Sequence, residues 1–460
     1  MAEQFKEQGG AATMDPSALL RWATSFLMTK LCRIERLNKR RASAEKARLK
    51  SVSAHVVEYF HQVEDGYSHL AAQTLKSLAD RYDIELVCHL VPGPQGDNVA
   101  EPELLLQLSR YDAFHVAGEY GLEFPRHDNA LPPELVTLAT GILAAQDNRG
   151  FIERAAETGR ALWAEDAAAL RRIADECGCA TEATVHEKMA VGEARRDALK
   201  HYSGAMFYYG GEWYWGVDRL YHLEQRFVAL GIDRTPAEPQ LVPRPAIDVP
   251  ALKDNGSLTL EVYPSLRSPY TAISFDRAVQ LARDTGVNLV VRPVLPMVMR
   301  GVPATRQKGM YIFWDTAREA RAAGVPFGKF YDPIGNPVRN AYSLYSWAQE
   351  QGRDIEFISA FLRCAFVEGV NINKPRGLRT VVEQAGLDWS TAEQRVGEPG
   401  WEETLEANRL SMYNAGLWGV PSFRLLNEAG EQILALWGQD RLWLFAREIQ
   451  RQLSARQSTQ

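Results

Sequence analysis

Ser268, Pro269 and Tyr270 stand where a helix is predicted to begin, directly after a short strand-forming run. Serine is a good helix N-cap and proline suits the first helical position, so on spacing alone a structural interpretation is favoured. The chemical alternative is that a free helix N-terminus stabilises an anion, and a hydroxyl there lowers the pKa of a nearby thiol. Ser268 cannot form a disulfide, so in that hypothesis the thiol arrives with a ligand.

A second motif, Gly419-Val420-Pro421-Ser422-Phe423, opens a predicted hairpin late in the chain. Proline is tolerated at the start of a strand, and in trans it would be an ordinary edge-strand residue. In cis it leaves the backbone N–H and C=O of the preceding valine facing outward. Such groups can pair with an extended peptide by strand addition.

Together with the run from Trp437 to Leu442 (WGQDRL), these motifs resemble the DsbA-like thioredoxin superfamily. Within that superfamily the sequence is most similar to 2-hydroxychromene-2-carboxylate isomerases and kappa-class glutathione transferases. The resemblance covers residues 258–450, and the three motifs follow one another in the family's order and separation. Residues 307–315 and 363–369 also resemble that family. The resemblance implies an enzyme that uses glutathione as its cofactor.

The resemblance implies a role for each residue that matches a family motif. Ser268 is the expected catalytic residue, because it matches the serine that hydrogen-bonds and activates the glutathione thiolate. The residues expected to bind glutathione are Lys308, near its glycine carboxylate; Val420, whose backbone pairs with its cysteine; Pro421, the cis-proline; and Gln439 with Asp440, which hold its γ-glutamyl end.

Other residues near these motifs carry weaker expectations. The family usually has an aspartate three residues before the serine, where this sequence has Ser265. Arg267 would suit an anionic substrate, but we interpret it as a solvated surface arginine. We expect Arg441 to be a structural ion-pair partner and Tyr270 to belong to the core or the pocket wall.

The elements that would position these residues occur twice in the chain. Residues 56–92 and 259–296 align with a shift of 203 and no gap, so that Glu58 meets Glu261. Each copy reads as strand, helix, strand, which is a parallel βαβ unit, and a helical stretch, an aromatic hairpin and a last helix follow. The sequence therefore predicts an α/β protein with two tandem thioredoxin-like (DsbA-like) domains, each with an inserted helical subdomain.

The domain prediction divides the chain into four segments. They are a basic helical arm (1–50), a degenerate DsbA-like domain (51–235), a proline-rich linker (236–257) and a DsbA-like domain with an intact site (258–460). The linker contains five prolines, which favour extended polyproline conformations.

The first copy has lost the features that define the site. Asp65-Gly66 replaces the Ser-Pro pair, and Gly204-Ala205-Met206 replaces the Val-Pro-Ser run. An aspartate at that helix start would repel a thiolate. Because related enzymes form dimers, we expect the first copy to act as an intramolecular pseudo-partner, with a homodimer as the other arrangement.

Composition narrows the class of protein. The chain has 460 residues, a net charge of −6 and five cysteines, with no Cys-x-x-Cys pair. The charge argues against a general nucleic-acid partner, and the sparse, odd cysteine count argues for a reducing cytoplasm over a disulfide framework. No apolar run reaches the roughly 18–20 residues that a membrane span needs. Cys177 and Cys179 lack a second ligand pair for zinc, so no metal is expected.

The sequence leaves three functions open. The leading hypothesis is a glutathione-dependent isomerase or transferase that acts on a small, electron-poor conjugated substrate derived from an aromatic compound. The second is a DsbA-like thiol-disulfide oxidoreductase that works through bound glutathione. The third is a non-catalytic scaffold built from thioredoxin-like folds.

Overall fold

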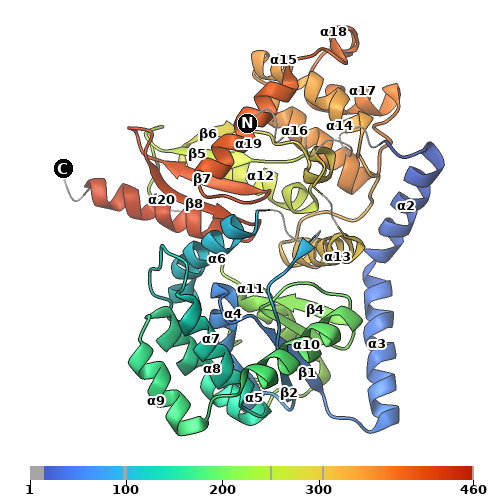
Figure 1. Ribbon diagram of the computed structural model, residues 1–460. Coiled ribbons are helices and arrows are strands. Elements are labelled where there is room, and N and C mark those ends of the chain that lie inside the picture. The colour runs from blue at the N-terminus through green and yellow to red at the C-terminus, as the bar shows by residue number, and fades with distance from the viewer. Residues whose placement is uncertain (1–14, 97–100, 249–250, 303–304, 458–460) are drawn as a thin grey trace. The chain divides into compact units, whose positions relative to one another are not determined.

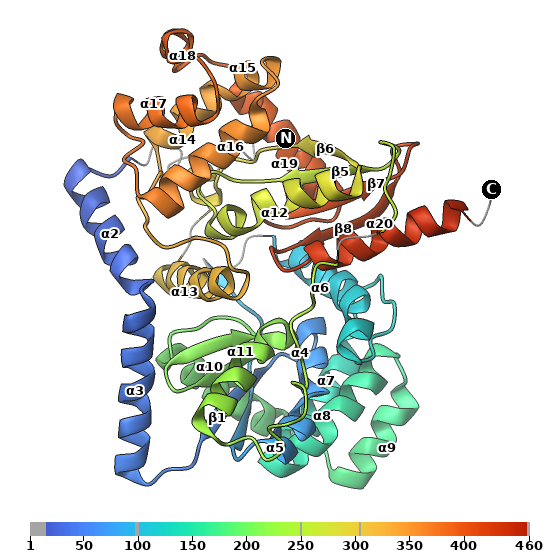
Figure 2. The same ribbon diagram turned by 180° about the vertical axis from the view of Figure 1, so that it is seen from behind.

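The computed structural model describes residues 15–96, 101–248, 251–302 and 305–457. The chain divides into an N-terminal unit, residues 38–245, and a C-terminal unit that combines residues 1–37 with residues 246–460 (Figures 1 and 2). Residues 1–14 of the predicted arm and 249–250 of the predicted linker lie outside the described residues.

The N-terminal unit contains a four-stranded mixed sheet in the order β2-β1-β3-β4. Central strand β1 runs parallel to β2 and antiparallel to β3, and β3 forms a hairpin with β4. The strands are β1 (Val56–His61), β2 (Glu85–Leu90), β3 (Met206–Tyr209) and β4 (Glu212–Trp215).

Helices of this unit fall into three groups along the chain. Helices α4 (Gly66–Ala72) and α5 (Leu75–Arg81) connect β1 to β2, and α11 (Gly216–Leu230) follows β4 and packs on α4. Between β2 and β3 lie α6 (Pro102–Ala117), η3 (Gly118–Tyr120), α7 (Pro133–Ala144), α8 (Asn148–Trp163), α9 (Ala167–Cys177) and α10 (Glu182–Ala198). Helix α3 (Ile34–Ser51) precedes β1, and its residues from 38 on belong to this unit.

The C-terminal unit contains a sheet of the same topology, in the order β6-β5-β7-β8. Strand β5 pairs in parallel with β6 and antiparallel with β7. The strands are β5 (Thr259–Tyr263), β6 (Asn288–Val291), β7 (Ser422–Leu426) and β8 (Gln432–Trp437). The mixed α/β class predicted from the sequence is confirmed.

Helix α12 (Pro269–Thr285) connects β5 to β6 and packs against α20 (Leu442–Gln457), which follows β8. Between β6 and β7 the chain forms a helical group, which Figure 2 shows beside the sheet of this unit. Its members are η4 (Met297–Arg300), α13 (Arg306–Ala322), α14 (Asn336–Ser343), α15 (Tyr345–Glu350), α16 (Asp354–Arg363), η5 (Cys364–Glu368), α17 (Pro375–Gln384), α18 (Trp389–Arg395) and α19 (Trp401–Asn414).

The central strand of each sheet is buried on both faces, as expected of strands covered by helices, and each carries one buried glutamate, Glu58 in β1 and Glu261 in β5. In β1, Tyr59 and Phe60 are fully buried, and in β5 so are Leu260 and Tyr263. Burial of these side chains fixes the register of each central strand, since a slip of one residue would move every side chain to the other face.

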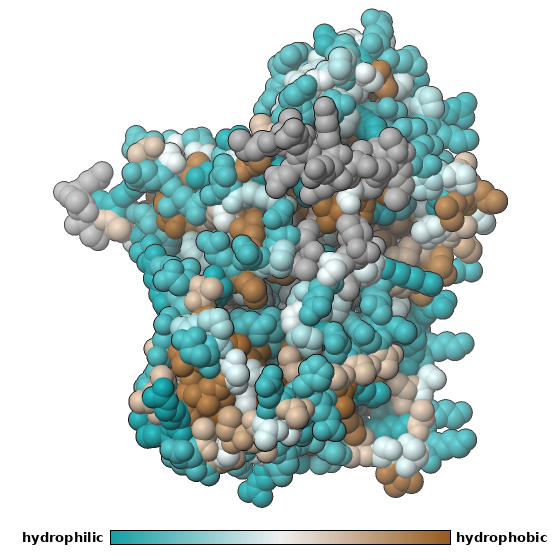
Figure 3. Space-filling model, in the orientation of Figure 1, coloured by the Kyte–Doolittle hydropathy of each residue, from teal (hydrophilic) through white to brown (hydrophobic). Residues whose placement is uncertain are grey.

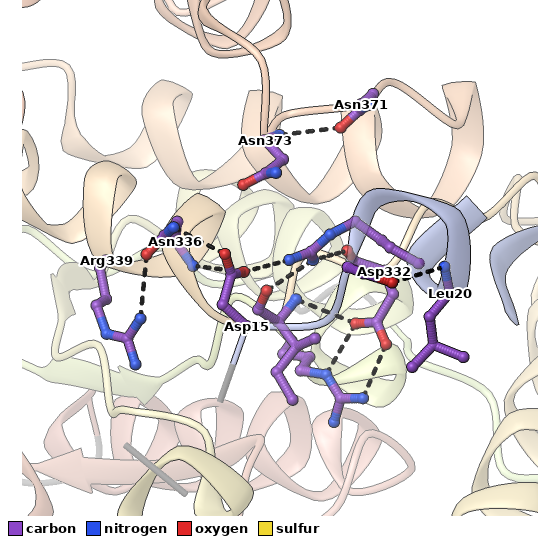
Figure 4. Close-up of polar contacts among 11 residues, drawn as sticks. Asp15, Leu20, Asp332, Asn336, Arg339, Asn371 and Asn373 are labelled. Carbon is purple, nitrogen blue, oxygen red and sulfur yellow. Dashed lines mark hydrogen bonds and ion pairs between the residues drawn. The ribbon is translucent and has the colours of Figure 1, made fainter. Parts of the chain in front are cut away.

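Helix α2 (Ala18–Leu31) belongs to the C-terminal unit and is held there by polar side chains. Arg21 is 1% exposed, and its Nη1 donates to the backbone carbonyls of Asp332 and Ile334, both at 2.6 Å. Ser25 Oγ accepts from the backbone N–H of Asp332 at 2.9 Å. Figure 4 shows Asp15 beside Asn336, whose amide donates to it at 2.8 Å.

The outer face of α2 is apolar and exposed. Trp22 stacks on Phe26 with ring centroids 5.5 Å apart, and both side chains are about half exposed. Leu19, Leu20 and Leu27 are exposed as well, and brown side chains mark this edge of the molecule in Figure 3. Helix α2 is therefore polar where it is buried and apolar where it meets solvent, the reverse of the usual pattern.

We predict that Arg21→Leu lowers the free energy of unfolding of the C-terminal unit by about 3 kcal/mol. The reason is that two buried backbone carbonyls lose their hydrogen-bond donor and Asp15 loses its ion-pair partner. Urea unfolding followed by circular dichroism measures this loss. The control Arg33→Leu, at an exposed position next to the same helix, should stay within about 0.5 kcal/mol of the wild type. Equal stability of the two variants would show that α2 is not docked through Arg21.

Candidate functional site

Ser268 is the N-cap of α12, at the end of the loop that leaves β5. Its backbone is extended (φ −89°, ψ 117°), and its Oγ accepts a hydrogen bond from the backbone N–H of Thr271 at 3.2 Å. The residue is partly exposed, so it is accessible to a ligand. The N-cap interpretation is confirmed, and its role toward a thiolate stays a prediction.

Strand pairing brings the second motif to the same end of the sheet. Ser422, the first residue of β7, pairs with Tyr263, the last residue of β5, five positions before Ser268. The peptide bond between Val420 and Pro421 is cis. Within the described part of the chain, neither the N–H nor the C=O of Val420 has a hydrogen-bond partner. The backbone groups that the sequence predicted for ligand pairing are therefore available.

Lys308 lies in the first turn of α13, which Thr305 caps by accepting from the backbone N–H of Lys308 at 3.2 Å. The lysine is only 8% exposed, and its Nζ lies 5.1 Å from the ring centroid of Trp418. Burial lowers the pKa of Lys308 to about 8. Trp418 is two residues from Val420, so the structure brings Lys308 to the second motif, as the predicted shared role requires.

Two tryptophans and a glycine pack closely together beside the second motif. The rings of Trp418 and Trp437 meet edge to face, with centroids 5.2 Å apart. A Cβ at Gly419 would lie 3.0 Å from Nε1 of Trp437, closer than nearly all real contacts of this kind. Glycine at position 419 therefore lets the loop before Pro421 approach the end of β8 without displacing Trp437.

Gln439 and Asp440 follow β8 but differ in accessibility. Gln439 is 1% exposed; its amide donates to Glu319 Oε2 at 2.8 Å and accepts from Arg277 Nη1 at 3.3 Å. Both ends of that amide therefore have partners within the protein. Asp440 is partly exposed and lies 3.7 Å from Arg441, which confirms the predicted ion-pair role of Arg441.

Arg267 is not a solvated surface arginine, and that interpretation is wrong. Its guanidinium makes two hydrogen bonds to the carboxylate of Asp332, at 2.9 and 3.0 Å. Burial alone would raise the pKa of Asp332, but the charge and hydrogen bonds of Arg267 outweigh it and hold the pKa below its ordinary value. Figure 4 shows this carboxylate with its two dashed contacts.

Asp332 also receives Arg21 and Ser25 of α2 on its backbone, so helix α2 is connected to Arg267, the neighbour of Ser268. Sequence reasoning missed this chain of contacts. The partners are more than 300 positions apart, and neither a spacing nor a motif connects them. Arg277 and Glu319, which hold Gln439, also gave no sequence signal.

Tyr270 is held by the buried ion pair between Asp315 and Arg318. Its hydroxyl donates to Asp315 Oδ2 at 2.8 Å, and Arg318 donates to the other oxygen of that carboxylate at 2.5 Å. These contacts join the start of α12 to α13, which carries Lys308. They give Tyr270 a structural role.

The five cysteines are free, and none of them lies at the start of α12. No group of histidine, cysteine, aspartate or glutamate side chains that could hold a metal occurs among the described residues. No described helix has the length and hydropathy needed to cross a bilayer.

Residues 259–450 match the family model of the DSBA-like thioredoxin domain. This part of the chain therefore belongs to the DsbA-like superfamily, as the three motifs predicted. A comparison with curated proteins gave no match.

Solved structures resemble the chain over less than half of its length. A 2-hydroxychromene-2-carboxylate isomerase is 20% identical, with 44% of this chain and 99% of that chain covered and a TM-score of 0.37. The cytosolic disulfide reductase DsbM from Pseudomonas aeruginosa is 18% identical, with 44% and 100% covered and a TM-score of 0.34. Similarities this distant do not indicate an activity for this chain. The assignment of residues 259–450 to the superfamily rests on the family model.

We predict opposite effects for two glycine-to-alanine changes in this unit. Gly419→Ala should destabilise it by about 1–3 kcal/mol, because the new methyl group forces Trp437 to move. Gly309→Ala, in the interior of α13 with no atom within 4 Å of the added Cβ, should stabilise it by up to about 1 kcal/mol. Thermal unfolding measures both changes. A neutral Gly419→Ala would contradict the close approach to Trp437.

Proposed function

We propose that the C-terminal unit binds glutathione and that the protein is a glutathione-dependent isomerase or transferase, similar to 2-hydroxychromene-2-carboxylate isomerases and kappa-class glutathione transferases. The observation that carries the proposal is the combination of a DSBA-like domain with a serine at the start of α12. Because no cysteine stands there, a reaction that needs a thiol must take it from a ligand.

The side chains at this end of the sheet fit a tripeptide thiol with two carboxylates and one ammonium group. Ser268 offers a hydroxyl at a helix N-terminus, where negative charge is stabilised. Val420 offers a backbone N–H and C=O that have no partner among the described residues. Lys308 supplies a cation for a carboxylate, and Asp440 supplies a carboxylate for the ammonium.

Gln439 enters the proposal in a modified role. Its amide is held by Arg277 and Glu319, so we propose that it positions the turn carrying Asp440 and does not bind the ligand through its side chain.

Each residue then contributes a defined physical effect. When bound, glutathione supplies a nucleophilic thiolate that adds to an electron-poor conjugated carbon and, after bond rotation, can leave again or be retained. Ser268 donates a hydrogen bond that keeps the sulfur ionised, and the N-terminus of α12 adds to that stabilisation. Val420 and Lys308 fix the position of the thiol relative to the substrate. The reaction then proceeds between two groups bound in one site and does not depend on their random encounter in solution.

The DSBA-like domain favours a second candidate, a disulfide oxidoreductase that acts through bound glutathione. In that case one disulfide sulfur accepts the thiolate and the other leaves as a thiolate. Assays with a dinitrophenyl halide and with a small symmetric disulfide separate the two activities. A protein that binds no glutathione at all would be a scaffold.

We further propose that residues 51–235 are a degenerate copy of the 258–460 domain, preceded by a basic arm (1–50) and joined by a proline-rich linker (236–257). The shared strand order of the two sheets supports this duplication. Free cysteines throughout are consistent with a reducing compartment such as the cytoplasm.

We predict that Ser268→Ala raises the pKa of the bound glutathione thiol by about 1–2 units, because one hydrogen bond to the thiolate is lost. The ultraviolet absorbance of the thiolate, titrated against pH in the full-length protein, measures this value without a second substrate. Turnover with the dinitrophenyl halide should fall by about 100-fold.

The matched control for Ser268→Ala is Thr181→Ala, which removes an N-cap from α10 in the other unit. It should cost about 1 kcal/mol of stability and leave the thiol pKa unchanged. An unaltered thiol pKa in Ser268→Ala would contradict the proposed role of the serine.

We predict that affinity for S-methylglutathione falls as pH rises through about 8, because Lys308 is charged below its pKa and neutral above it. Above that pH the decline should approach about tenfold per unit. Calorimetric titrations between about pH 6 and about pH 10 measure it, and the methyl group removes the ligand thiol from the titration.

Lys308→Arg is the control, because a guanidinium stays protonated over this whole range. The ligand's own ammonium group titrates equally in both proteins, so the difference between the two profiles isolates Lys308. Superimposable profiles would contradict the contact between Lys308 and a ligand carboxylate.

A further inference from the structure

The N-terminal unit contains a cavity of about 260 Å³ that the proposed function does not use. Its wall comes from the loop between β1 and α4, the segment after β2, helix α6, the approach to β3 and the end of β4. The lining residues are Gln62, Glu64, Asp65, Tyr67, Gly93, Pro94, Gln95, Pro102, Leu105, Leu106, Ser109, Ser203 and Trp215.

This cavity occupies the place in its sheet that the candidate glutathione site occupies in the other sheet. Asp65 caps α4 after β1, as Ser268 caps α12 after β5. The hydroxyl of Tyr67 donates to Asp112 on α6 at 2.8 Å, which matches the contact that joins Tyr270 to Asp315 on α13. Trp215 ends β4 in the way that Trp437 ends β8.

The charge at this place is reversed between the two units. The residues at the helix start are Glu64 and Asp65 in one unit and Arg267 and Ser268 in the other. Among the described residues that line the cavity, the charged ones are Glu64 and Asp65, and none is a lysine, arginine or histidine. A thiolate or carboxylate ligand would be repelled here, and a cation would be attracted.

Both carboxylates are held in place. Asp65 is 8% exposed, and its Oδ2 accepts from the backbone N–H and the hydroxyl of Ser68, both at 2.9 Å. Gln62 donates to Glu64 Oε1 at 2.9 Å. Gln62 is itself confined, because a Cβ at Gly93 or Gly204 would lie 2.8 or 2.6 Å from its side chain. Such preorganisation reduces the entropy lost when a ligand binds.

Burial raises the pKa of Asp65 to about 6, and the neighbouring charge of Glu64 acts in the same direction. The carboxylate is still ionised at neutral pH. Among the described residues that line the cavity, none is a cation that would compensate its charge. A bound ammonium group would supply that compensation.

The rest of the wall suits an apolar body. Tyr67 and Trp215 meet edge to face with centroids 6.2 Å apart, and Leu105, Leu106 and Pro102 add aliphatic surface. Aromatic faces also attract cations. The volume is slightly below the roughly 300–1,000 Å³ of drug-sized sites, so the ligand is small.

We propose that the N-terminal unit binds a small organic cation in this cavity, a primary ammonium group on an aromatic or aliphatic body. Glu64 and Asp65 receive the ammonium group, and Tyr67, Trp215 and the leucines of α6 contact the body. This site is separate from the proposed glutathione chemistry and stands whether or not the C-terminal unit binds glutathione.

Calorimetry of the full-length protein with 2-phenylethylamine and with 2-phenylethanol tests the proposal, because the two probes differ only in the charged group. The amine should bind at least about tenfold more tightly than the alcohol at neutral pH. Glu64→Gln and Asp65→Asn should each weaken the amine by about tenfold or more and leave the alcohol unchanged. Asparagine preserves the N-cap of α4.

The control variant is Asp80→Asn, which removes an exposed carboxylate of the same unit that pairs with Lys76. It should bind the amine as the wild type does. Equal binding of amine and alcohol would overturn the proposal. The absence of amine binding up to about 10 mM would overturn it as well, because that concentration is well above the Kd of about 1 mM of a weak small-molecule site. If Asp65→Asn does not fold, unchanged amine affinity in Glu64→Gln alone overturns it.

Discussion

The antiparallel pairing of β5 with β7 is the constraint on which the candidate site depends. It places Ser422 opposite Tyr263, although 159 positions of chain separate them. Because Ser268 follows β5 and Val420 precedes β7, this one register puts a helix N-terminus and an unpaired backbone edge at the same end of the sheet. A slip of one residue would move every side chain of β5 to the other face of the sheet, so the packing of the core also fixes the geometry of the site.

Around that edge, buried polar contacts determine which groups remain available to a ligand. Arg277 and Glu319 occupy the amide of Gln439, and Asp332 occupies Arg267. Buried polar groups need partners, so each of these residues is committed to the protein. Burial lowers the pKa of Lys308 because it makes the charge costly, and a carboxylate ligand would offset that cost.

The two sheets show how one topology can present opposite electrostatics. Both have the same strand order and a capped helix after the first strand, yet the caps are Asp65 and Ser268. An aspartate satisfies the backbone N–H groups of a helix start as well as a serine does. The fold therefore tolerates the exchange, while the preferred charge of a ligand changes sign.

The sequence by itself determined the mixed α/β class, the N-cap of α12 and the DsbA-like domain, which three motifs in the family's order indicated. Strand patterns, capping residues and motif order are local and can be read directly from the chain. Only the tertiary structure decided that Arg267 is paired, that Gln439 is engaged and that α2 joins the C-terminal unit through Arg21. Those outcomes depend on partners up to 313 positions away, and a side chain's partner and burial follow from packing, which no local pattern encodes.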